Sequence, residues 1–308
     1  MISTLRKYYN NSTIGFYLLK PVVIVYHIFL MDKYLSQKQY LEKKFKKYFK
    51  YPLDLENPKT LNEKISWLKL HDRNPLMGPA ADKYAVREYI KNKLGEKYLV
   101  PLLYTTLNPK DIKPENLPDV PCIIKVNHNS SGGIIVRDKY SPDVDYTYIK
   151  NTLRWNMSEN YYWNGREPQY RNIIPRIIVE KLLMDDEGNI PFDYKFHFFN
   201  GKLAFAQVDS DRLTNHKRNL YSADWENLPC SWEYEKGKFI DKPVSFNEMK
   251  ELGTILAQDF TYVRVDFYAL GDKVFFGELT FHSDGGIGPF TPHEYDLKFG
   301  DMLVLPKK

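Results

Sequence analysis

The chain is most constrained by residues 264–280, which read as two antiparallel strands joined by a short turn. Polar and apolar residues alternate along the first strand, so that strand has one polar and one apolar face. The positions expected to share a face are Arg264, Asp266 and Tyr268 on the first strand and Phe276, Glu278 and Thr280 on the second. The pattern therefore predicts a sheet with charged residues gathered on one side.

The register of this hairpin decides whether its two acids meet. A turn made only of residues 271–272 would place Asp266 and Glu278 on opposite faces of the sheet. A three-residue turn at 271–273, or a bulge, would pair the two acids on one face. Paired carboxylates suit Mg²⁺, which usually takes one or two of them together with substrate phosphates. Two interpretations stay open at this point: a Mg²⁺ site, or an ion-pair cluster in which Arg264 neutralises both acids.

Composition limits the class of protein. The chain has 308 residues, of which 43% are hydrophobic, so a substantial core is expected and wholesale disorder is excluded. Its two cysteines, Cys122 and Cys230, have neither disulfide-scaffold nor metal-ligand spacing, which fits a reducing compartment. The seven histidines show no H-x-x-x-H or similar pattern, so no zinc site is expected.

The basic character of the chain belongs to its first fifty residues. They hold ten Lys and Arg against two acids, a net +8, whereas the whole chain is +5. This favours a local anionic partner and disfavours a general nucleic-acid surface. The apolar run 14–31, interrupted at Lys20 and Pro21, is too short after the proline to span a bilayer. Three interpretations stay open: a helix lying on an anionic membrane surface, a buried helix hairpin, or a signal anchor.

A lysine and a Ser/Gly turn follow one another in the middle of the chain. Residues 121–126 read as a short buried strand that ends near Lys125, and a second strand is expected at 134–136. Small residues in the intervening turn would let backbone N–H groups approach an anion, while lysine supplies a point charge. The order of residues is not that of a Walker A loop, and an ordinary hairpin is the alternative.

Other segments give the expected element order. Thr60 and Glu63 form a capping-box pattern at the start of a helix. A hairpin is predicted to turn at Asn200-Gly201. The remaining expectations are a helix that starts at Asp82, a strand at 98–104, a loop at 161–171, a buried strand at 176–183 and a helix at 245–260.

Taken in order, these features resemble the ATP-grasp superfamily, and more closely its TupA-like branch, named for teichuronopeptide biosynthesis. The resemblance covers about residues 54–305. Its carriers are Pro58-Lys-Thr-Leu-Asn-Glu-Lys64, Asp82-Lys83-Tyr84, Ile124-Lys125, Ser131-Gly132-Gly133, Ile178-Val-Glu180, Asp193-Tyr-Lys195, Arg264-Val-Asp266 and Gly277-Glu-Leu-Thr280.

The resemblance implies an α+β fold in which two subdomains clasp ATP. Residues 1–75 would be a helical, basic segment, with contact to a membrane surface as one of its open interpretations, and residues 76–308 the ATP-grasp domain. Within that domain a small lid subdomain would cover about 115–180 and carry the phosphate loop. A C-terminal subdomain, about 181–308, would carry the metal site.

The resemblance also implies roles for individual residues. The expected ATP-binding residues are Lys83, Lys125, the loop residues Ser130, Ser131, Gly132 and Gly133, the hinge residues Glu180, Lys181, Leu182 and Leu183, and Asp193 with Lys195 near the ribose. The expected Mg²⁺ ligands, for two ions, are Asp266, Glu278 and Thr280. Arg264 and Lys125 would act in catalysis, with Arg264 steadying a developing acyl phosphate. Thr280 departs from the asparagine that many ATP-grasp enzymes carry there.

The implied activity is an ATP- and Mg²⁺-dependent ligation of a carboxylate to an amine through an acyl phosphate. The expected partners are an amino acid or amine and a carboxylate-bearing saccharide such as a uronic acid of a capsular or other cell-surface polysaccharide, lipid-linked or free. The expected place is the cytoplasm, including the inner face of a bacterial plasma membrane. Two rivals are kept: a glycosyltransferase, for which Asp209-Ser-Asp211 is the one D-x-D triplet, and a non-catalytic nucleotide-binding protein.

Overall fold

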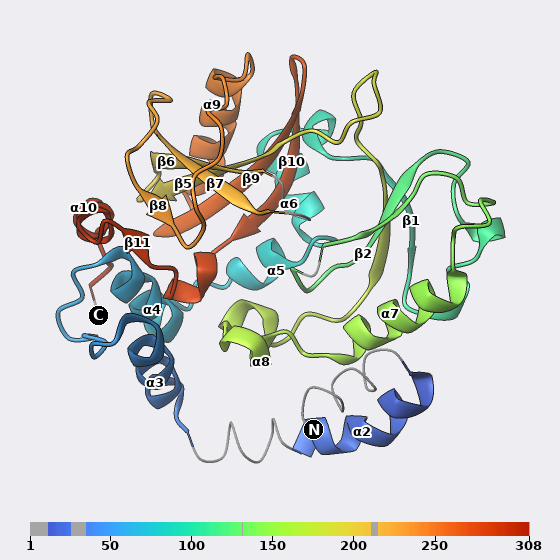
Figure 1. Cartoon of the computed structure of the whole chain (residues 1–308), viewed down its shortest axis with the longest axis horizontal. Helices are drawn as coiled ribbons and strands as arrows, with labels where there is room; N and C mark the ends of the chain where they lie inside the picture. Colours follow the sequence, from blue (N-terminus) through green and yellow to red (C-terminus); the bar gives the residue numbers. More distant parts are fainter. Residues whose placement is uncertain (1–11, 26–34, 131, 211–214, 308) are drawn as a thin grey trace. The chain divides into compact units, whose positions relative to one another are not determined.

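The computed structural model describes residues 12–25, 35–130, 132–210 and 215–307. These residues form helices and antiparallel sheets, and the α+β fold class is confirmed (Figure 1). The chain divides into two compact units. The first comprises Met1–Tyr40, Pro101–Arg166 and Tyr170–Leu182, and the second comprises Leu41–Val100, Glu167–Gln169 and Leu183–Lys308.

The first unit contains a four-stranded antiparallel sheet in the order β1-β4-β2-β3. Its strands are β1 (Leu102–Thr106), β2 (Cys122–Val126), β3 (Ile134–Val136) and β4 (Ile177–Lys181). Its helices are α2 (Thr13–Val25), α7 (Tyr146–Ser158) and α8 (Tyr162–Gly165), with short 3₁₀ turns η3 (Pro109–Asp111) and η4 (Pro114–Asn116). The 3₁₀ turn η5 (Pro168–Tyr170) contains residues of both units. Ile149 and Leu153 of α7 share one buried core with Ile124 of β2 and Val179 of β4. That helix therefore covers one face of the sheet.

The second unit contains a five-stranded antiparallel sheet in the order β10-β9-β5-β6-β7. Its strands are β5 (Asp193–Phe199), β6 (Lys202–Ser210), β7 (Lys217–Ser222), β9 (Tyr262–Leu270) and β10 (Lys273–Thr280), beside a small pair of β8 (Ser231–Trp232) and β11 (Phe290–Thr291). Its helices are α4 (Leu61–His71), α5 (Met77–Ala81), α6 (Val86–Lys93), α9 (Phe246–Ala257) and α10 (Glu294–Met302), with 3₁₀ turns η2 (Glu96–Tyr98) and η6 (Ser283–Gly286). Helix α3 (Gln37–Phe49) contains residues of both units.

The five-stranded sheet has one apolar face and one charged face. The apolar face is covered by α9, where the rings of Phe196 and Phe246 lie 5.6 Å apart. Gly253 lets that helix approach closely, because a Cβ at this position would collide with the ring of Phe198. The opposite face carries the ionisable side chains that form the candidate site.

Several local predictions are confirmed. The Thr60–Glu63 capping box forms at the start of α4, and α9 lies within the helix predicted at 245–260. The hairpin turns at Asn200-Gly201, where both residues have positive φ (49° and 79°), as a type I′ turn requires.

Other local predictions are wrong for identifiable reasons. The strand expected at 98–104 begins only at Leu102, because the chain passes from the second unit to the first after Val100 and the two halves of the run pair with different sheets. The loop expected at 161–171 contains the one-turn helix α8, which is too short for a periodic signal. The helix expected at Asp82 begins at Val86, because the Asp82 carboxylate caps a preceding turn.

Candidate functional site

The β9–β10 hairpin brings the two acids together through a bulge. Lys273 pairs with Leu270, so the turn consists of residues 271–272 alone, and of the two alternatives, a three-residue turn or a bulge, the bulge occurs. The register then shifts between Phe276 and Glu278, which leaves Gly277 as an extra residue and places Glu278 opposite Asp266. The predicted pairing of the two acids is confirmed.

Gly277 suits this bulge because there is little room for a side chain. A Cβ at Gly277 would lie 3.0 Å from the carbonyl oxygen of Asp266 and 3.3 Å from its Cβ. Without the bulge the side chain of Glu278 would point to the apolar face of the sheet. One glycine therefore sets the register that creates the acid pair.

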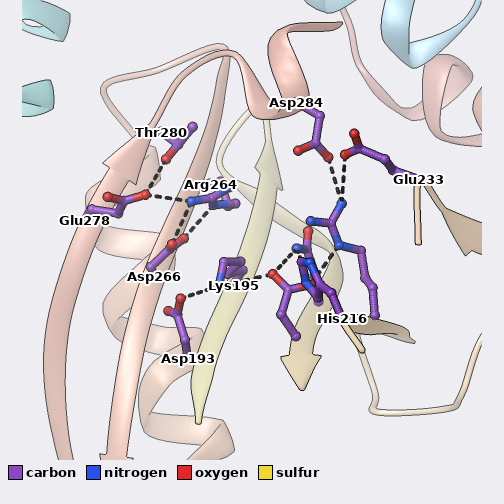
Figure 2. A network of polar contacts seen from close by, with 12 residues as sticks. Asp193, Lys195, His216, Glu233, Arg264, Asp266, Glu278, Thr280 and Asp284 are labelled. Atoms are coloured by element: carbon purple, nitrogen blue, oxygen red, sulfur yellow. Dashed lines mark hydrogen bonds and ion pairs between the residues drawn. The ribbon is translucent and has the colours of Figure 1, made fainter. Parts of the chain in front are cut away.

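Arg264 holds both acids, and we call Arg264, Asp266 and Glu278 the Arg264 cluster (Figure 2). Its Nε and Nη2 each donate to the carboxylate of Asp266 at 2.7 Å, and Nη2 also donates to Glu278 Oε1 at 2.7 Å. Thr280 Oγ1 donates to Glu278 Oε1 at 3.1 Å, and Lys83 Nζ lies 3.5 Å from Glu278 Oε2. The predicted residues Lys83, Arg264, Asp266, Glu278 and Thr280 thus form one connected group in the second unit.

The two acids of the cluster differ in their electrostatics. Burial, opposed by Arg264 and reinforced by Asp193, raises the pKa of Asp266 to about 7. Burial would also raise the pKa of Glu278, but Lys83 and Arg264 outweigh it and hold that pKa at about 2. Glu278 also keeps 30% of its side chain exposed, whereas Asp266 keeps 3%. Glu278 is therefore the more accessible member of the pair, and the one whose ionised form is more strongly stabilised.

Lys195 extends this charged face to the next strand. On β5 it forms an ion pair with Asp193, and its Nζ lies 3.5 Å from Oδ2 of Asp209 on β6. In the strand register Lys195 is opposite Asp266, so it lies on the same face as the Arg264 cluster. Lys83, Lys195 and Arg264 thus place three cations around the acids, a distribution that suits a polyanion bridged by a metal ion.

In the first unit Lys125 pairs with Glu180. Lys125 Nζ lies 3.1 Å from Glu180 Oε2, across the neighbouring strands β2 and β4. Gly133 lies against the same strand, since a Cβ there would come within 2.5 Å of Ile123 and 3.0 Å of Lys125. Gly132 has a positive φ of 78° and the Ser130 hydroxyl contacts that of Tyr161. Ser131 lies outside the described residues.

Part of the predicted hinge already forms backbone hydrogen bonds within the first unit. The N–H groups of Lys181 and Leu182 donate to the carbonyls of Pro101 and Pro121, each at 2.9 Å. The Glu180 side chain is buried beside Lys125. Of the expected hinge residues, Leu183 is the one assigned to the second unit.

Sequence reasoning missed a second group of charged residues on the same sheet face. Arg218 of β7 is buried and contacts Asp209, Asp284 and Glu233, which come from β6, from η6 and from the residue after β8. Residues 217–222 show no alternation of polar and apolar residues that could have singled out Arg218. No sequence signal joins four segments that are so far apart in the chain.

Two properties of the described residues bear on metal binding and on membrane crossing. Within residues 12–25, 35–130, 132–210 and 215–307, no three or more His, Cys, Asp or Glu side chains are arranged to hold a metal ion. The two carboxylates of the Arg264 cluster still fit Mg²⁺, which completes its shell with phosphate oxygens and water. In the same part of the chain, no helix has the length and apolar character that crossing a membrane requires.

A comparison with protein families gives a match to the TupA-like ATPgrasp family over residues 63–304. The match covers most of the chain, and the chain belongs to the TupA-like ATP-grasp family. The resemblance stated from the sequence is confirmed, with nearly the same boundaries. No curated protein is similar enough to the chain to count as a match.

The chain is also similar, at low identity, to solved structures of ATP-grasp ligases. D-alanine–D-alanine ligase from Bacillus anthracis is 14% identical, with a TM-score of 0.43, over 86% of this chain and 92% of that chain. The corresponding ligase from Helicobacter pylori is 15% identical, with a TM-score of 0.42, over 81% and 68%. The ATP-grasp ligase PsnB, solved with a minimal precursor, Mg and ADP, is 12% identical, with a TM-score of 0.38, over 72% of this chain and only 58% of PsnB.

Proposed function

We propose that the chain is an ATP- and Mg²⁺-dependent ligase that joins an amino acid or other amine to a carboxylate, through an acyl phosphate. The acceptor in this proposal is a uronic acid of a capsular or other cell-surface polysaccharide, free or lipid-linked. The observation that carries it is the Arg264 cluster, in which a bulge sets two carboxylates opposite each other beneath three cations. Family membership supports the use of ATP.

Asp266 and Glu278 would hold Mg²⁺, with two ions in the complete site and Thr280 offering a hydroxyl oxygen as a third ligand. Bound there, the metal would neutralise charge on the ATP phosphates. Glu278 fits this role because it is ionised and accessible. Thr280 Oγ1 already donates its proton to Glu278, which leaves its lone pairs available.

The proposed ATP-binding residues of the first unit are Lys125, the loop 130–133 and the hinge 180–182. Those of the second unit are Lys83, Leu183, Asp193 and Lys195. The carboxylate substrate attacks the γ-phosphorus of ATP, the bond to ADP breaks, and the amine then displaces phosphate from the acyl phosphate. Arg264 and Lys125 would act by charge and position, because phosphoryl transfer needs alignment more than a nucleophilic side chain.

The test compares hairpin variants in ATP turnover. We expect Asp266→Asn and Glu278→Gln each to lower Mg²⁺-dependent ADP release by roughly 10²–10³-fold, the scale of losing one preorganised electrostatic group. Asp272→Asn, which changes an exposed acid in the turn of the same hairpin, is the matched control. Substrates are glucuronate and galacturonate, each with a pool of the twenty amino acids. Thr280→Val, which removes only the hydroxyl, tests the third ligand.

The outcomes separate the rivals. A folded protein that binds ATP but releases no ADP with any pair argues against the ligase. Thermal stabilisation by UDP-sugars and not by ATP would favour a glycosyltransferase, although Asp209 of the D-x-D triplet is buried in ion pairs. ATP binding that survives alanine at both acids, without turnover in the parent protein, would favour a non-catalytic role.

For the amino end we infer peripheral binding to an anionic membrane surface. Helix α2 exposes Ile14, Leu18, Val22 and Val25, at spacings of three and four residues that place them on one helical face. Pro21, which interrupts the apolar run in the sequence, lies inside this helix and does not end it. A lysine-rich helix, α3, follows in the chain. An apolar helix face that is followed in the sequence by a lysine-rich helix suits an anionic lipid surface.

Vesicle flotation tests this inference. Leu18→Glu should weaken binding to phosphatidylglycerol vesicles by roughly 10–100-fold, the scale of burying one leucine side chain. Ile190→Glu, at an isoleucine with 48% exposure in the second unit, is the control. Equal loss in the two variants, or no binding by the parent chain, would remove α2 as a membrane contact.

A further inference from the structure

The second charged group, which we call the Arg218 cluster, consists of Arg218, Asp209, Glu233 and Asp284. Glu233 and Asp284 are labelled in Figure 2. Arg218 Nε donates to Asp209 Oδ1 at 2.8 Å and Nη1 donates to Asp284 Oδ2 at 2.8 Å, while Glu233 Oε2 lies 3.8 Å from Nη1. The guanidinium is also held over the ring of Tyr234, 4.8 Å from its centroid. This mixed cluster fixes one cation among three acids.

The three acids are not equivalent. Asp209 has 2% of its side chain exposed. Its carboxylate forms ion pairs with Arg218 and Lys195 and accepts two hydrogen bonds from the Gln207 amide, so its charge is already balanced within the protein. Although burial alone would raise it, the pKa of Asp209 is held well below its usual range by Arg218 and Lys195. Asp284 and Glu233 keep 21% and 40% of their side chains exposed. Two acids of the cluster therefore face a region that a ligand can reach.

Arg218 also has donor capacity left. Its Nε and Nη1 account for the bonds to Asp209, to Asp284 and to the carbonyl of Trp232. No described residue accepts a hydrogen bond from Nη2. A guanidinium whose remaining edge is aligned by fixed acids is suited to bind a carboxylate, and the adjacent Glu233 and Asp284 are suited to bind an ammonium group.

The raised pKa of Glu233 agrees with a binding site for an ammonium group. Burial and the neighbouring Asp284 raise the pKa of Glu233 to about 7, against the lowering effect of Arg218. The other ionisable groups that face this pair are Asp209 and Tyr234, with His216 stacked on the Tyr234 ring. Near neutral pH the raised pKa of Glu233 favours a proton on its carboxylate, which a bound cation would displace.

The Arg218 cluster lies on the same sheet face as the Arg264 cluster. Lys195 links them, because it contacts Asp193 and Asp209 and pairs in register with Asp266. Strands β9 and β7 are separated by β5 and β6, so their backbones are three inter-strand spacings apart, about 14 Å. Long side chains and a small substrate can bridge such a distance.

We propose that the Arg218 cluster is the subsite for the amine substrate, and that this substrate is a free α-amino acid. Arg218 binds the α-carboxylate, and Glu233 with Asp284 binds the α-ammonium group. This proposal rests on the ligase function proposed above, and it adds which of the two substrates binds at this cluster and by which groups.

Glu233 also has a part in the reaction. The ammonium group transfers one proton to the Glu233 carboxylate, and the neutral amine attacks the carbonyl carbon of the acyl phosphate. The C–N bond forms, the C–O bond to phosphate breaks, and the departing phosphate carries away the second nitrogen-bound proton. Glu233 then returns its proton to solvent.

The experiment measures amino-acid binding by calorimetry, in the full chain with Mg²⁺ and ADP present. Each of the twenty amino acids is titrated, and the best one is compared with its methyl ester and its N-acetyl derivative. We expect Glu233→Gln to weaken binding roughly 10–100-fold, the scale of one hydrogen bond to a charged group. Glu235→Gln is the matched control, because Glu235 is two residues away, 84% exposed and paired with Lys217.

Further readouts separate a ligand role from a structural one. Titration in two buffers of different ionisation enthalpy should show proton release on binding near pH 6.5 in the parent protein, and none in Glu233→Gln. Arg218→Lys should lower affinity for the amino acid more than for its methyl ester. ATP binding should be unchanged in Glu233→Gln.

Each outcome decides one proposal. If Mg·ATP binds and turns over but Glu233→Gln and Glu235→Gln bind the amino acid alike, the subsite is wrong and the ligase stands. If no amino acid binds while turnover proceeds with another amine, the substrate class is wrong. If amino acids bind as described but ATP does not, the subsite stands as a binding site and the ligase proposal fails.

Discussion

The Arg264 and Arg218 clusters are built alike and were not equally visible in the sequence. Each has an arginine on the charged face of one sheet, holding carboxylates at 2.7–2.8 Å. The acids of the Arg264 cluster lie on one hairpin, 2 and 14 residues from the arginine. Those of the Arg218 cluster reach as far as 66 residues away. Clusters made by the register of one hairpin can be predicted, whereas clusters made by the topology of several segments cannot.

Removing each arginine should give the largest effects. Arg264→Met leaves Asp266 and Glu278 facing each other, and we expect a loss of about 3–5 kcal/mol in the free energy of unfolding, the usual result of breaking a buried ion pair. Arg218→Met should cost less, because Lys195 still lies 3.5 Å from Asp209. Urea denaturation at pH 7.5 measures both.

Mg²⁺ sharpens this contrast. If Asp266 and Glu278 can bind the ion, added Mg²⁺ should restore part of the stability of Arg264→Met, because Mg²⁺ then replaces the positive charge of the missing guanidinium. It should not restore Arg218→Met. Lys202→Met, at an exposed lysine of β6, controls for the loss of a surface charge. Equal rescue of both arginine variants would mean that Mg²⁺ acts on the protein as a whole.

We expect a change at the β-bulge to affect the Arg264 cluster and not the Arg218 cluster. In Gly277→Ala the new methyl group meets the backbone of Asp266, and we expect a loss of about 1–3 kcal/mol, the scale of overpacking a tight site. Turnover should fall as well, because Glu278 shifts relative to Asp266. Amino-acid binding at the Arg218 cluster should persist. Gly78→Ala is the control, since its Cβ would lie 3.8 Å from the nearest atom, an ordinary contact. A Gly277→Ala variant with parental stability and turnover would show that the register does not depend on this glycine.

The limits of prediction follow from the same geometry. Alternation along residues 264–280 predicted the charged face, and the requirement for an odd loop or a bulge was derived from it. Which of the two occurs could not be predicted, because Gly271 and Gly277 are both compatible with positions of unusual backbone geometry. In the first unit, Lys125 and Glu180 were each expected to meet ATP. That they pair with each other depends on the strand order β1-β4-β2-β3, which the sequence does not specify.

Buried Arg166 is a second residue whose contacts could not be predicted from the sequence. Its guanidinium lies over the ring of Tyr40, 4.6 Å from the centroid, and donates to the carbonyl of Leu35 at 3.0 Å. Those partners precede it by more than 120 residues. The segment around Arg166 lacks any period, so the sequence predicted a loop. The long-range contacts of the Arg166 side chain hold this segment in a defined conformation, and no local sequence pattern indicates them.

The smallest expected effect concerns the pH dependence of folding at the Arg218 cluster. The folded pKa of Glu233 is about 7, above its ordinary value of 4.5. Between these values the folded protein keeps a proton that the unfolded chain releases, so stability falls as pH rises from about 4.5 to about 7 and is level above that. Because 40% of the side chain is exposed, we expect a change of less than about 1 kcal/mol.

The neighbouring Glu235 makes the sign of this effect testable. Its hydrogen bond and ion pair with Lys217 lower its pKa, so its contribution is present above the ordinary value and is lost as pH falls. Urea midpoints at pH 5 and 7.5 should therefore show a smaller decline with pH in Glu233→Gln than in the parent, and no such reduction in Glu235→Gln. A saturating amino acid should also flatten the parental decline, because its ammonium group replaces the proton on Glu233. If Glu233→Gln instead declines as steeply as the parent, Glu233 holds no proton at neutral pH. The resemblance between the two clusters would then end at their arginines.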